Sequence, residues 1–467
     1  YFSKKPVSLT KETVEEYNQT RSGFNHRMIC YAPFTNLFFG YEGKIGVCCY
    51  NRTHLLGTYP ETSIRDAWFG SPVSVLRKKI KNVDLLAGCY GCHTQWLEKA
   101  YNTVLARNYD HLRTWGKYPK SMEFELSNRC NLNCIMCSEE NSSFIAKERL
   151  GWDEKLKPYN NDFVHDLEEF IPQLHSAKFL GGEPFLIPIY YKIWDAITRL
   201  NPGCEILVQT NGTILNERIK KLLNAGNVAL NISIDSLKKE SFEMIRVNAD
   251  FESTFDNLLY FIDFCKKNKR YIGITACFMQ QNWQDIPHLI DFCNQHKIPI
   301  TFNRVWAPPK CAVWGSSSEL ITEILTFYQK QQFPQASSLE SANCNAFNDL
   351  ISLLQSWKQQ AEKQEVSAVM VDLQKEKDIP IPREVKTWMQ KVEEDPTLTQ
   401  NNQKIKGDDD SVLQPIATTV TKITLPTDKK SFTGGFGKPV DDAWRWLSEF
   451  ILRVIKKNEG KVKFKEE

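Results

Sequence analysis

Three cysteines near residue 130 stand close enough in the sequence to hold an iron–sulfur cluster. Cys130, Cys134 and Cys137 form a C-x3-C-x2-C triplet directly after an apolar segment. A structural zinc ion takes four protein ligands, and an electron-transfer [4Fe–4S] cluster takes four cysteines. Three thiolates would leave one iron of such a cluster open to a ligand that is not protein. The triplet therefore predicts a cluster with an open iron, and a zinc site with a distant fourth ligand is the alternative.

A glycine-rich segment follows the triplet, at the end of the next predicted strand. Gly181 and Gly182 would let the backbone approach a ligand closely, and Glu183, before Pro184, would supply a negative charge. With the triplet, this segment resembles the signature of the radical S-adenosylmethionine (SAM) superfamily. The resemblance implies that SAM chelates the open iron, with its amino group on residues 181–184. It also implies reductive cleavage of SAM to a 5′-deoxyadenosyl radical.

The resemblance extends to single residues that would contact SAM. Asn211 and Ser233 stand at later strand ends and would meet the ribose hydroxyls or the methionyl carboxylate. Arg246 matches a family arginine that can pair with that carboxylate. Met136 replaces the aromatic residue that usually precedes the third cysteine, and it can fill the same space near the adenine.

Two further polar residues are expected near the substrate. Asp235 and Arg304, on the fourth and sixth predicted strands, are the catalytic candidates. The resemblance favours a peptide or protein side chain as substrate, with a flavodoxin or ferredoxin as electron donor. A small molecule, a sugar or a nucleic acid is the alternative, and the lack of a dense basic, aromatic-laced patch disfavours nucleic acid. An iron–sulfur or zinc protein for binding or electron transfer, without SAM chemistry, is the alternative of another class.

A second group of cysteines precedes the triplet. Cys30, Cys48, Cys89 and Cys92 are the four expected ligands, and Cys49 is the alternative to Cys48. Their surroundings resemble the auxiliary-cluster domain, of the twitch or SPASM type, of radical SAM maturases, although such domains usually follow the barrel. The resemblance implies a second [4Fe–4S] cluster. A zinc ribbon is the alternative, because C-x2-C pairs bind either metal.

β-rich runs alternate with helical segments between residues 121 and 306. The predicted strands are Met122–Ser127, Ala177–Gly181, Glu205–Thr210, Val228–Asp235, Ile272–Phe278 and Ile298–Trp306. The predicted helices between them include Asp162–Leu174, Ile189–Leu200, Glu217–Asn224 and Phe255–Lys267. This alternation predicts an α/β fold, a partial (β/α)6 TIM-like barrel around a parallel sheet. The triplet then lies at the carboxyl edge, where such folds bind ligands.

The chain divides into five predicted parts. They are a small cysteine-rich α+β auxiliary-cluster domain (1–117), the barrel (118–312), a helical extension (313–365), a polar, partly disordered linker (366–440) and an amphipathic basic helix (441–467). In the first part we expect a hairpin of Tyr31–Gly40 and Lys44–Tyr50, a helix from near Ser63 and a helix over Thr94–Leu112. The last helix could dock on its own protein, on a partner or on a membrane surface.

Composition limits the remaining possibilities. The 467 residues carry a net charge of +3 and show no apolar run long enough for a membrane span. We also expect no export signal, so the 14 cysteines favour reduced thiols and metal ligands over disulfides. These features together predict a cytoplasmic protein that is not integral to a membrane.

Overall fold

The structure is a computed structural model that describes most of the first 375 residues. The described residues are 9–21, 26, 28–85, 87–97, 99, 101, 104–112, 116–151, 158–375, 423–424, 447 and 462–463. The chain forms two compact units, Tyr1–Lys377 and Asp378–Glu467. Most of the predicted helix at 441–467 and most of the predicted linker lie outside the described residues. Within that predicted helix, Val462–Lys463 are the short strand β11, which pairs with β10 at Ile423–Thr424, so the helix does not extend over these two residues. No described helix is both long and apolar enough to cross a membrane.

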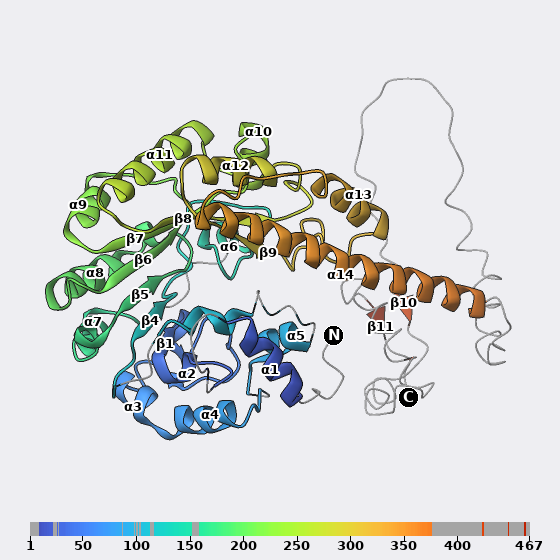
Figure 1. The fold of residues 1–467 in the computed structure, drawn as a ribbon. Helices are drawn as coiled ribbons and strands as arrows, with labels where there is room; N and C mark the ends of the chain where they lie inside the picture. The colour runs from blue at the N-terminus through green and yellow to red at the C-terminus, as the bar shows by residue number, and fades with distance from the viewer. Residues whose placement is uncertain are drawn as a thin grey trace, which may run out of the picture. The chain divides into compact units, whose positions relative to one another are not determined.

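The first unit is built on a nine-stranded sheet with the order β3-β2-β1-β4-β5-β6-β7-β8-β9. The strands are β1 Asn36–Phe39, β2 Lys44–Gly46, β3 Gly57–Thr58, β4 Ser121–Phe124, β5 Ser176–Phe179, β6 Glu205–Thr210, β7 Val228–Ser233, β8 Ile272–Phe278 and β9 Ile300–Arg304. The strands β4 to β9 are parallel neighbours in chain order (Figure 1). The predicted partial barrel is therefore confirmed, with most strands shorter than predicted.

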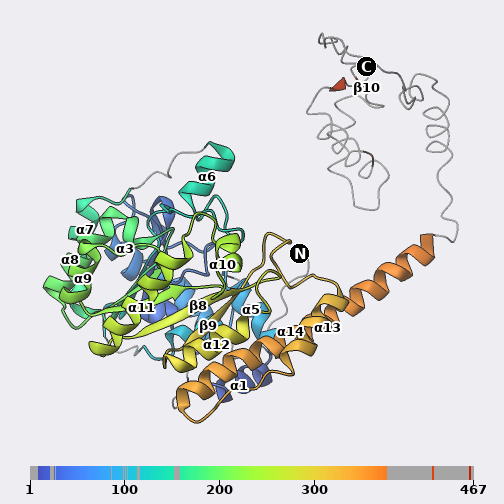
Figure 2. The ribbon, with the colours of Figure 1, turned by 90° about the horizontal axis from the view of Figure 1, so that it is seen from above.

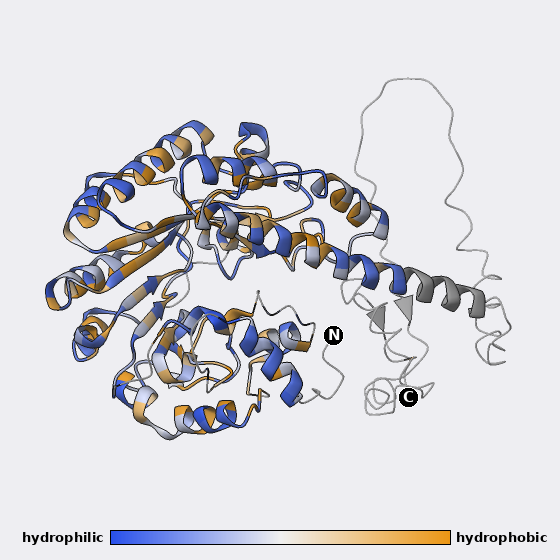
Figure 3. Ribbon diagram, viewed as in Figure 1, coloured by the Kyte–Doolittle hydropathy of each residue, from blue (hydrophilic) through white to orange (hydrophobic). Residues whose placement is uncertain are grey.

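Helices follow the strands of this sheet, and most of them lie along its outer side (Figure 2). They are α6 Ser143–Leu150, α7 Asn161–Leu167, α8 Pro188–Leu200, α9 Glu217–Ala225, α10 Lys239–Ile245, α11 Phe251–Lys267, α12 Ile286–Gln295, α13 Ser318–Tyr328 and α14 Ser338–Lys375. Side-chain caps start several of them; Asn216 and Asp250, for example, accept from the backbone at the start of α9 and α11. Figure 3 shows hydrophobic residues along the strands and mixed faces on the covering helices, as a buried sheet requires.

Two helix predictions need correction. The helix predicted over Asp162–Leu174 ends at Leu167 and is followed by a 3-10 turn at Ile171–Gln173, because Pro172 lacks the N–H that an α-helix needs. The helical extension predicted to end at residue 365 continues as α14 to Lys375.

The N-terminal segment adds to the same sheet. Its helices are α1 Lys11–Gln19, α2 Ala32–Thr35, α3 Ile64–Phe69, α4 Ser71–Lys81 and α5 Tyr90–Leu97, which gather at the β1 side (Figure 1). The predicted hairpin is present as antiparallel β1 and β2, and β1 also pairs in parallel with β4. The division at residue 117 stays a prediction, and the sheet runs across it.

The N-terminal element bounds differ from the predicted ones. The first predicted strand begins as the helical turn α2, which has Pro33 in its first turn. The helix predicted over Thr94–Leu112 is wrong: α5 ends at Leu97, and a 3-10 helix follows at Leu105–Tyr109.

Candidate functional site

The triplet loop follows β4 at the carboxyl edge and is tied to the segment after α10. The backbone N–H groups of Asn133 and Ile135 donate to Val247 and Ile245, both at 3.0 Å. Burial raises the pKa of each triplet thiol to about 11, and the charge of a neighbouring triplet thiol adds to each rise. The three thiols therefore face a common region. Within the described residues, no three or more Cys, His, Asp or Glu side chains are already drawn into a metal-ligating group.

Gly181 and Gly182 pack against the backbone that leads into the triplet. The Gly182 N–H donates to the Ser127 carbonyl at 3.1 Å, and the Glu183 N–H donates to the Arg129 carbonyl at 2.7 Å. A Cβ on Gly182 would lie 2.3 Å from the Arg129 oxygen, and Gly181 has φ +111°. Both glycines are thus required for the close approach of two loops at the strand ends.

The Glu183 carboxylate is fully buried and joins two strand ends. One oxygen accepts from the Thr210 hydroxyl at 2.8 Å and from the Phe185 N–H at 3.1 Å, and the other accepts from the Asn211 N–H at 2.7 Å. Burial raises the pKa of Glu183 to about 7, although these three donors lower it. Pro184 follows at the start of a 3-10 turn.

Asn211 belongs to a small polar network that includes the triplet loop. Its amide donates to Asn131 Oδ1 at 3.0 Å, and its Oδ1 accepts from the Thr213 hydroxyl at 2.7 Å. Asn131 in turn donates to Thr213 Oγ1 at 2.9 Å. Sequence reasoning missed Asn131 and Thr213, although Asn131 lies inside the triplet and Thr213 directly follows the Thr-Asn-Gly strand end.

Asp235 and Arg246 form a buried ion pair. Arg246 Nη2 lies 2.9 Å from Asp235 Oδ2, and the two side chains are 6% and 0% exposed. Asp235 Oδ1 accepts from the Cys277 N–H at 2.7 Å. Asp235 is therefore enclosed and positions Arg246, and its place near the substrate stays a prediction. Arg246 Nε is buried beside Cys134 with no hydrogen-bond partner among the described residues, so its free N–H fits the carboxylate of a bound SAM.

Two further residues predicted to contact SAM, Met136 and Ser233, lie in an apolar and in a polar environment, respectively. Met136 packs against an apolar cluster beside the triplet, made of Ile245, Met279, Val305 and Cys311. Ser233 accepts from the Gln209 amide at 2.8 Å on the inner face of the barrel.

Arg304 does not share that inner face. It is in register with Phe278, which stacks on Trp357 of α14. Because register partners lie on the same face of a sheet, Arg304 belongs to the helix-covered side. The geometry therefore gives no support to its predicted catalytic role.

The four N-terminal cysteines predicted as ligands line one cavity. They are Cys30, Cys48, Cys89 and Cys92. Burial raises the pKa of Cys89 to about 11 and that of Cys92 to about 12, and it raises the pKa of Cys30 and Cys48 further. Charges on the other thiols add to the rise for Cys30, so these thiols lie near one another. Cys49 does not line the cavity.

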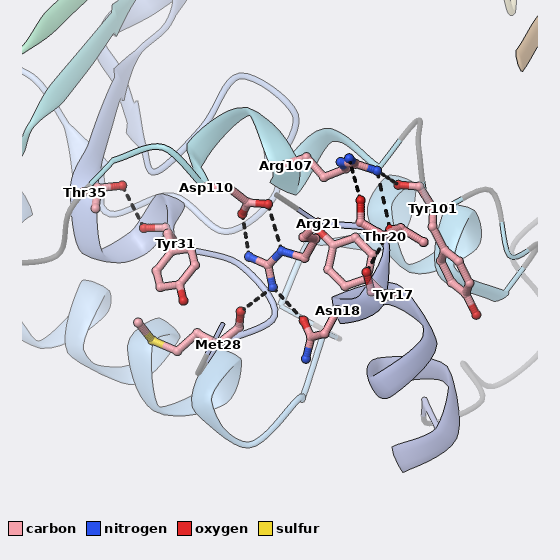
Figure 4. A network of polar contacts seen from close by, with 10 residues as sticks. All are labelled: Tyr17, Asn18, Thr20, Arg21, Met28, Tyr31, Thr35, Tyr101, Arg107 and Asp110. Carbon is pink, nitrogen blue, oxygen red and sulfur yellow. Dashed lines mark hydrogen bonds and ion pairs between the residues drawn. The ribbon is translucent and has the colours of Figure 1, made fainter. Parts of the chain in front are cut away.

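A buried arginine holds two walls of this cavity together (Figure 4). Arg21 Nε donates to Asp110 at 2.8 Å, and its Nη1 donates to Asn18 at 2.8 Å and to the Met28 carbonyl at 2.9 Å. Met28 lies two residues before Cys30, and Asp110 directly follows Tyr109, which lines the cavity. Arg21 therefore fixes the Cys30 segment against the turn at residue 110.

The cavity also borders the first strand of the barrel. Tyr109 donates to Glu123 Oε1 at 2.8 Å, and the Cys49 N–H donates to Glu123 Oε2 at 3.1 Å. Arg52 forms two hydrogen bonds with Glu125, at 3.2 and 2.6 Å. The cysteine cavity and the triplet loop therefore share β4 and its extension as a common support.

Comparison with known families agrees with this arrangement. Residues 124–293, which carry the triplet, the Gly-Gly-Glu-Pro segment and the later strand ends, match the Radical SAM superfamily. Residues 124–293 are thus a radical SAM domain. The matched region begins at Phe124, the last residue of β4, and includes the whole of β5 to β8.

Curated relatives match part of the chain. GTP 3′,8-cyclase of Clostridium perfringens is 27% identical over 192 residues, which cover 40% of this chain and 56% of the relative. Fe-coproporphyrin III synthase of Methanosarcina barkeri is 25% identical over 226 residues, 48% of this chain and 52% of the relative. The chain thus spans about half the length of the curated relatives that it matches.

Solved structures resemble the chain more distantly. Native anSMEcpe with bound AdoMet has a TM-score of 0.36 at 18% identity, over 45% of this chain and 61% of that one. SuiB of Streptococcus suis bound to S-adenosylmethionine has a TM-score of 0.35 at 14% identity, over 55% of this chain and 58% of that one.

Proposed function

We propose that this chain binds a [4Fe–4S] cluster and SAM and cleaves SAM reductively to act on a substrate C–H bond. The observation that carries the proposal is one continuous set of contacts among the triplet loop, Gly181–Glu183 and Arg246. When bound, the cluster supplies one electron to the sulfonium of SAM, which gives methionine and a 5′-deoxyadenosyl radical that abstracts a hydrogen atom.

The residues of the chain divide the work of binding. Cys130, Cys134 and Cys137 would ligate three irons and leave the fourth to SAM. The unpartnered Arg246 Nε would receive the methionyl carboxylate, and the backbone of residues 181–184 would receive the amino group. The apolar cluster around Met136 would cover the adenine and exclude water from it.

A second cluster is proposed for the N-terminal cavity. Four thiols around one hollow would saturate a [4Fe–4S] cluster, and Cys49, turned toward Glu123, would not be a ligand. Iron analysis after anaerobic reconstitution tests this assignment. We expect about eight irons per chain for the wild type and Cys49→Ala and about four for Cys48→Ala. Zinc in place of the second set of irons would overturn it.

The proposed substrate is a peptide or protein side chain. This part of the proposal rests on the resemblance of the N-terminal cysteines to those of maturases. A small molecule is the second candidate, because curated relatives are named GTP 3′,8-cyclase. A flavodoxin or ferredoxin in the cytoplasm is the expected electron donor. Deuterium transfer from labelled candidates into 5′-deoxyadenosine would distinguish the two substrate classes.

The direct test of the enzyme activity is anaerobic reduction of the reconstituted protein with dithionite in the presence of SAM. We expect methionine and 5′-deoxyadenosine in equal amounts. A reduced cluster that leaves SAM intact would contradict the proposal and favour an electron-transfer protein.

A further inference from the structure

The inner face of the barrel is polar in this protein. The interior of a TIM barrel is usually filled with branched apolar side chains. Here Ala177 and Phe179 are fully buried on the outer, helix-covered face of β5, so Lys178 between them faces inward. Register and alternation place other polar residues on the same inner face: Glu123, Gln209, Asn231, Ser233, Thr275, Cys277 and Asn303.

Most of these polar groups already have partners within the chain. Gln209 donates to Ser233, and the hydroxyls of Thr275 and Thr301 are hydrogen-bonded at 2.9 Å. The carboxylates of Glu123 and Glu125 accept from the N-terminal segment instead of from the barrel. The inner face is thus an ordered polar surface and is not a set of loosely solvated side chains.

Two polar groups of this face, on β5 and β7, bear on ligand binding. Lys178 is in register with Glu123, yet both Glu123 oxygens are turned to Tyr109 and to the Cys49 N–H. Across the part of the chain that the structure describes, the Lys178 ammonium makes no hydrogen bond or ion pair; the residue is partly buried and lies near the Cys49 thiol. Asn231 Oδ1, two strands away, is buried with no hydrogen-bond partner in the same described set. A buried acceptor without a partner is costly unless a ligand completes it, and an ammonium without an anion partner is available to a ligand.

We propose that Lys178 is an anion subsite of the barrel, which holds a carboxylate or phosphate group of the substrate while Asn231 accepts from a neighbouring donor group. This inference rests on the proposed function, because it places the substrate between the two cysteine sites. An ammonium gives a strong, charge-assisted hydrogen bond to a carboxylate or to a phosphate, so the subsite would bind a substrate that carries either group. The subsite would orient the substrate so that one C–H bond faces the SAM side of the barrel.

Competitive acylation of the reconstituted full chain tests the subsite. The amines are acetylated with an N-hydroxysuccinimide ester, and the rates at Lys178 and Lys221 are read by peptide mass spectrometry. Inorganic phosphate, glutarate or chloride is present at matched ionic strength. Lys221 is an exposed lysine on α9 and serves as the matched control. We expect phosphate or glutarate to slow the acylation of Lys178 about tenfold, which is the effect of one charge-assisted hydrogen bond. The acylation rate of Lys221 should not change.

Each outcome has a defined meaning. Protection by phosphate alone assigns a phosphate-bearing substrate, and protection by glutarate alone assigns a carboxylate. Equal effects at both lysines, no protection at Lys178, or a Lys178 that is unreactive even in chloride would overturn the subsite. The readout needs no SAM cleavage. Protection of Lys178 in a chain that forms no 5′-deoxyadenosine would therefore refute the proposed enzyme activity and leave the anion subsite standing.

Discussion

At the residue scale, Gly182 provides a test of the contact between the SAM-binding segment and the triplet loop. A methyl group in Gly182→Ala would meet the backbone of Arg129 at 2.3 Å, and backbone cannot move aside as a flexible side chain would. We expect a loss of about 3 kcal/mol in the free energy of unfolding and weaker SAM binding. Gly203→Ala is the control, because its nearest atom is 3.7 Å away. Equal melting midpoints for the two variants would contradict the geometry.

Glu183 predicts a pH dependence of stability. Burial raises its pKa from 4.5 to about 7, so the folded state binds a proton more tightly than the unfolded state. The stability that this carboxyl contributes is present below pH 4.5 and is lost as the pH rises through about 7. The free energy of unfolding of the wild type, measured relative to that of Glu183→Gln by thermal unfolding, should fall by up to about 3 kcal/mol over this pH range. A difference in the free energy of unfolding between the two proteins that does not vary with pH would contradict the burial of the Glu183 carboxyl group.

The residue types at the site were predictable, but several of their partners were not. The cysteine triplet and Gly181–Pro184 have spacings specific enough to name the chemistry. Asp235 and Arg246 were both predicted at the site, yet sequence gives no sign that they pair with each other. That pairing depends on the path of the chain after β7, which brings Arg246 back over the end of the strand.

At the scale of elements, the Arg21 network joins α1, the segment before Cys30 and the 3-10 helix at Leu105–Tyr109 (Figure 4). Arg21→Met would leave Asp110 buried without its cation, at a cost of about 3 kcal/mol. We expect the N-terminal cavity to lose its iron while the triplet keeps its own, which reconstitution and iron analysis would measure.

Arg65→Met is the matched control for Arg21→Met. Arg65 pairs with Glu169 on the surface with a side chain 54% exposed, so its loss should cost less than about 1 kcal/mol. Equal iron loss in both variants would show that the effect is not specific to the Arg21 network.

The same network explains a failed prediction. Sequence pattern predicts one helix over residues 94–112, but the chain leaves the helix at Leu97. Arg107 then donates to the carbonyls of Tyr101 and Thr20. The contact to Thr20 reaches a segment that is distant in the sequence, and local periodicity carries no information about it. The barrel strands were predictable because each is a short β-rich run between helices.

At the scale of the whole molecule, the N-terminal segment and the barrel share one sheet. The parallel pairing of β1 with β4 supports β4, and Glu123 and Glu125 depend on donors from the N-terminal segment. Deletion of residues 1–117 should therefore expose the β4 edge and two buried carboxylates, and should give aggregated protein. A soluble, cooperatively melting 118–467 fragment would show that the barrel folds alone.

The measurement that tests the central claim most directly is 5′-deoxyadenosine formation by reduced, reconstituted protein with SAM. The wild type and Cys204→Ala, which alters a buried thiol outside both sites, should release 5′-deoxyadenosine and methionine together. Cys134→Ala should release none, because the cluster that SAM would chelate loses a ligand. Absence of 5′-deoxyadenosine from wild-type protein with an intact, reduced cluster would contradict the account.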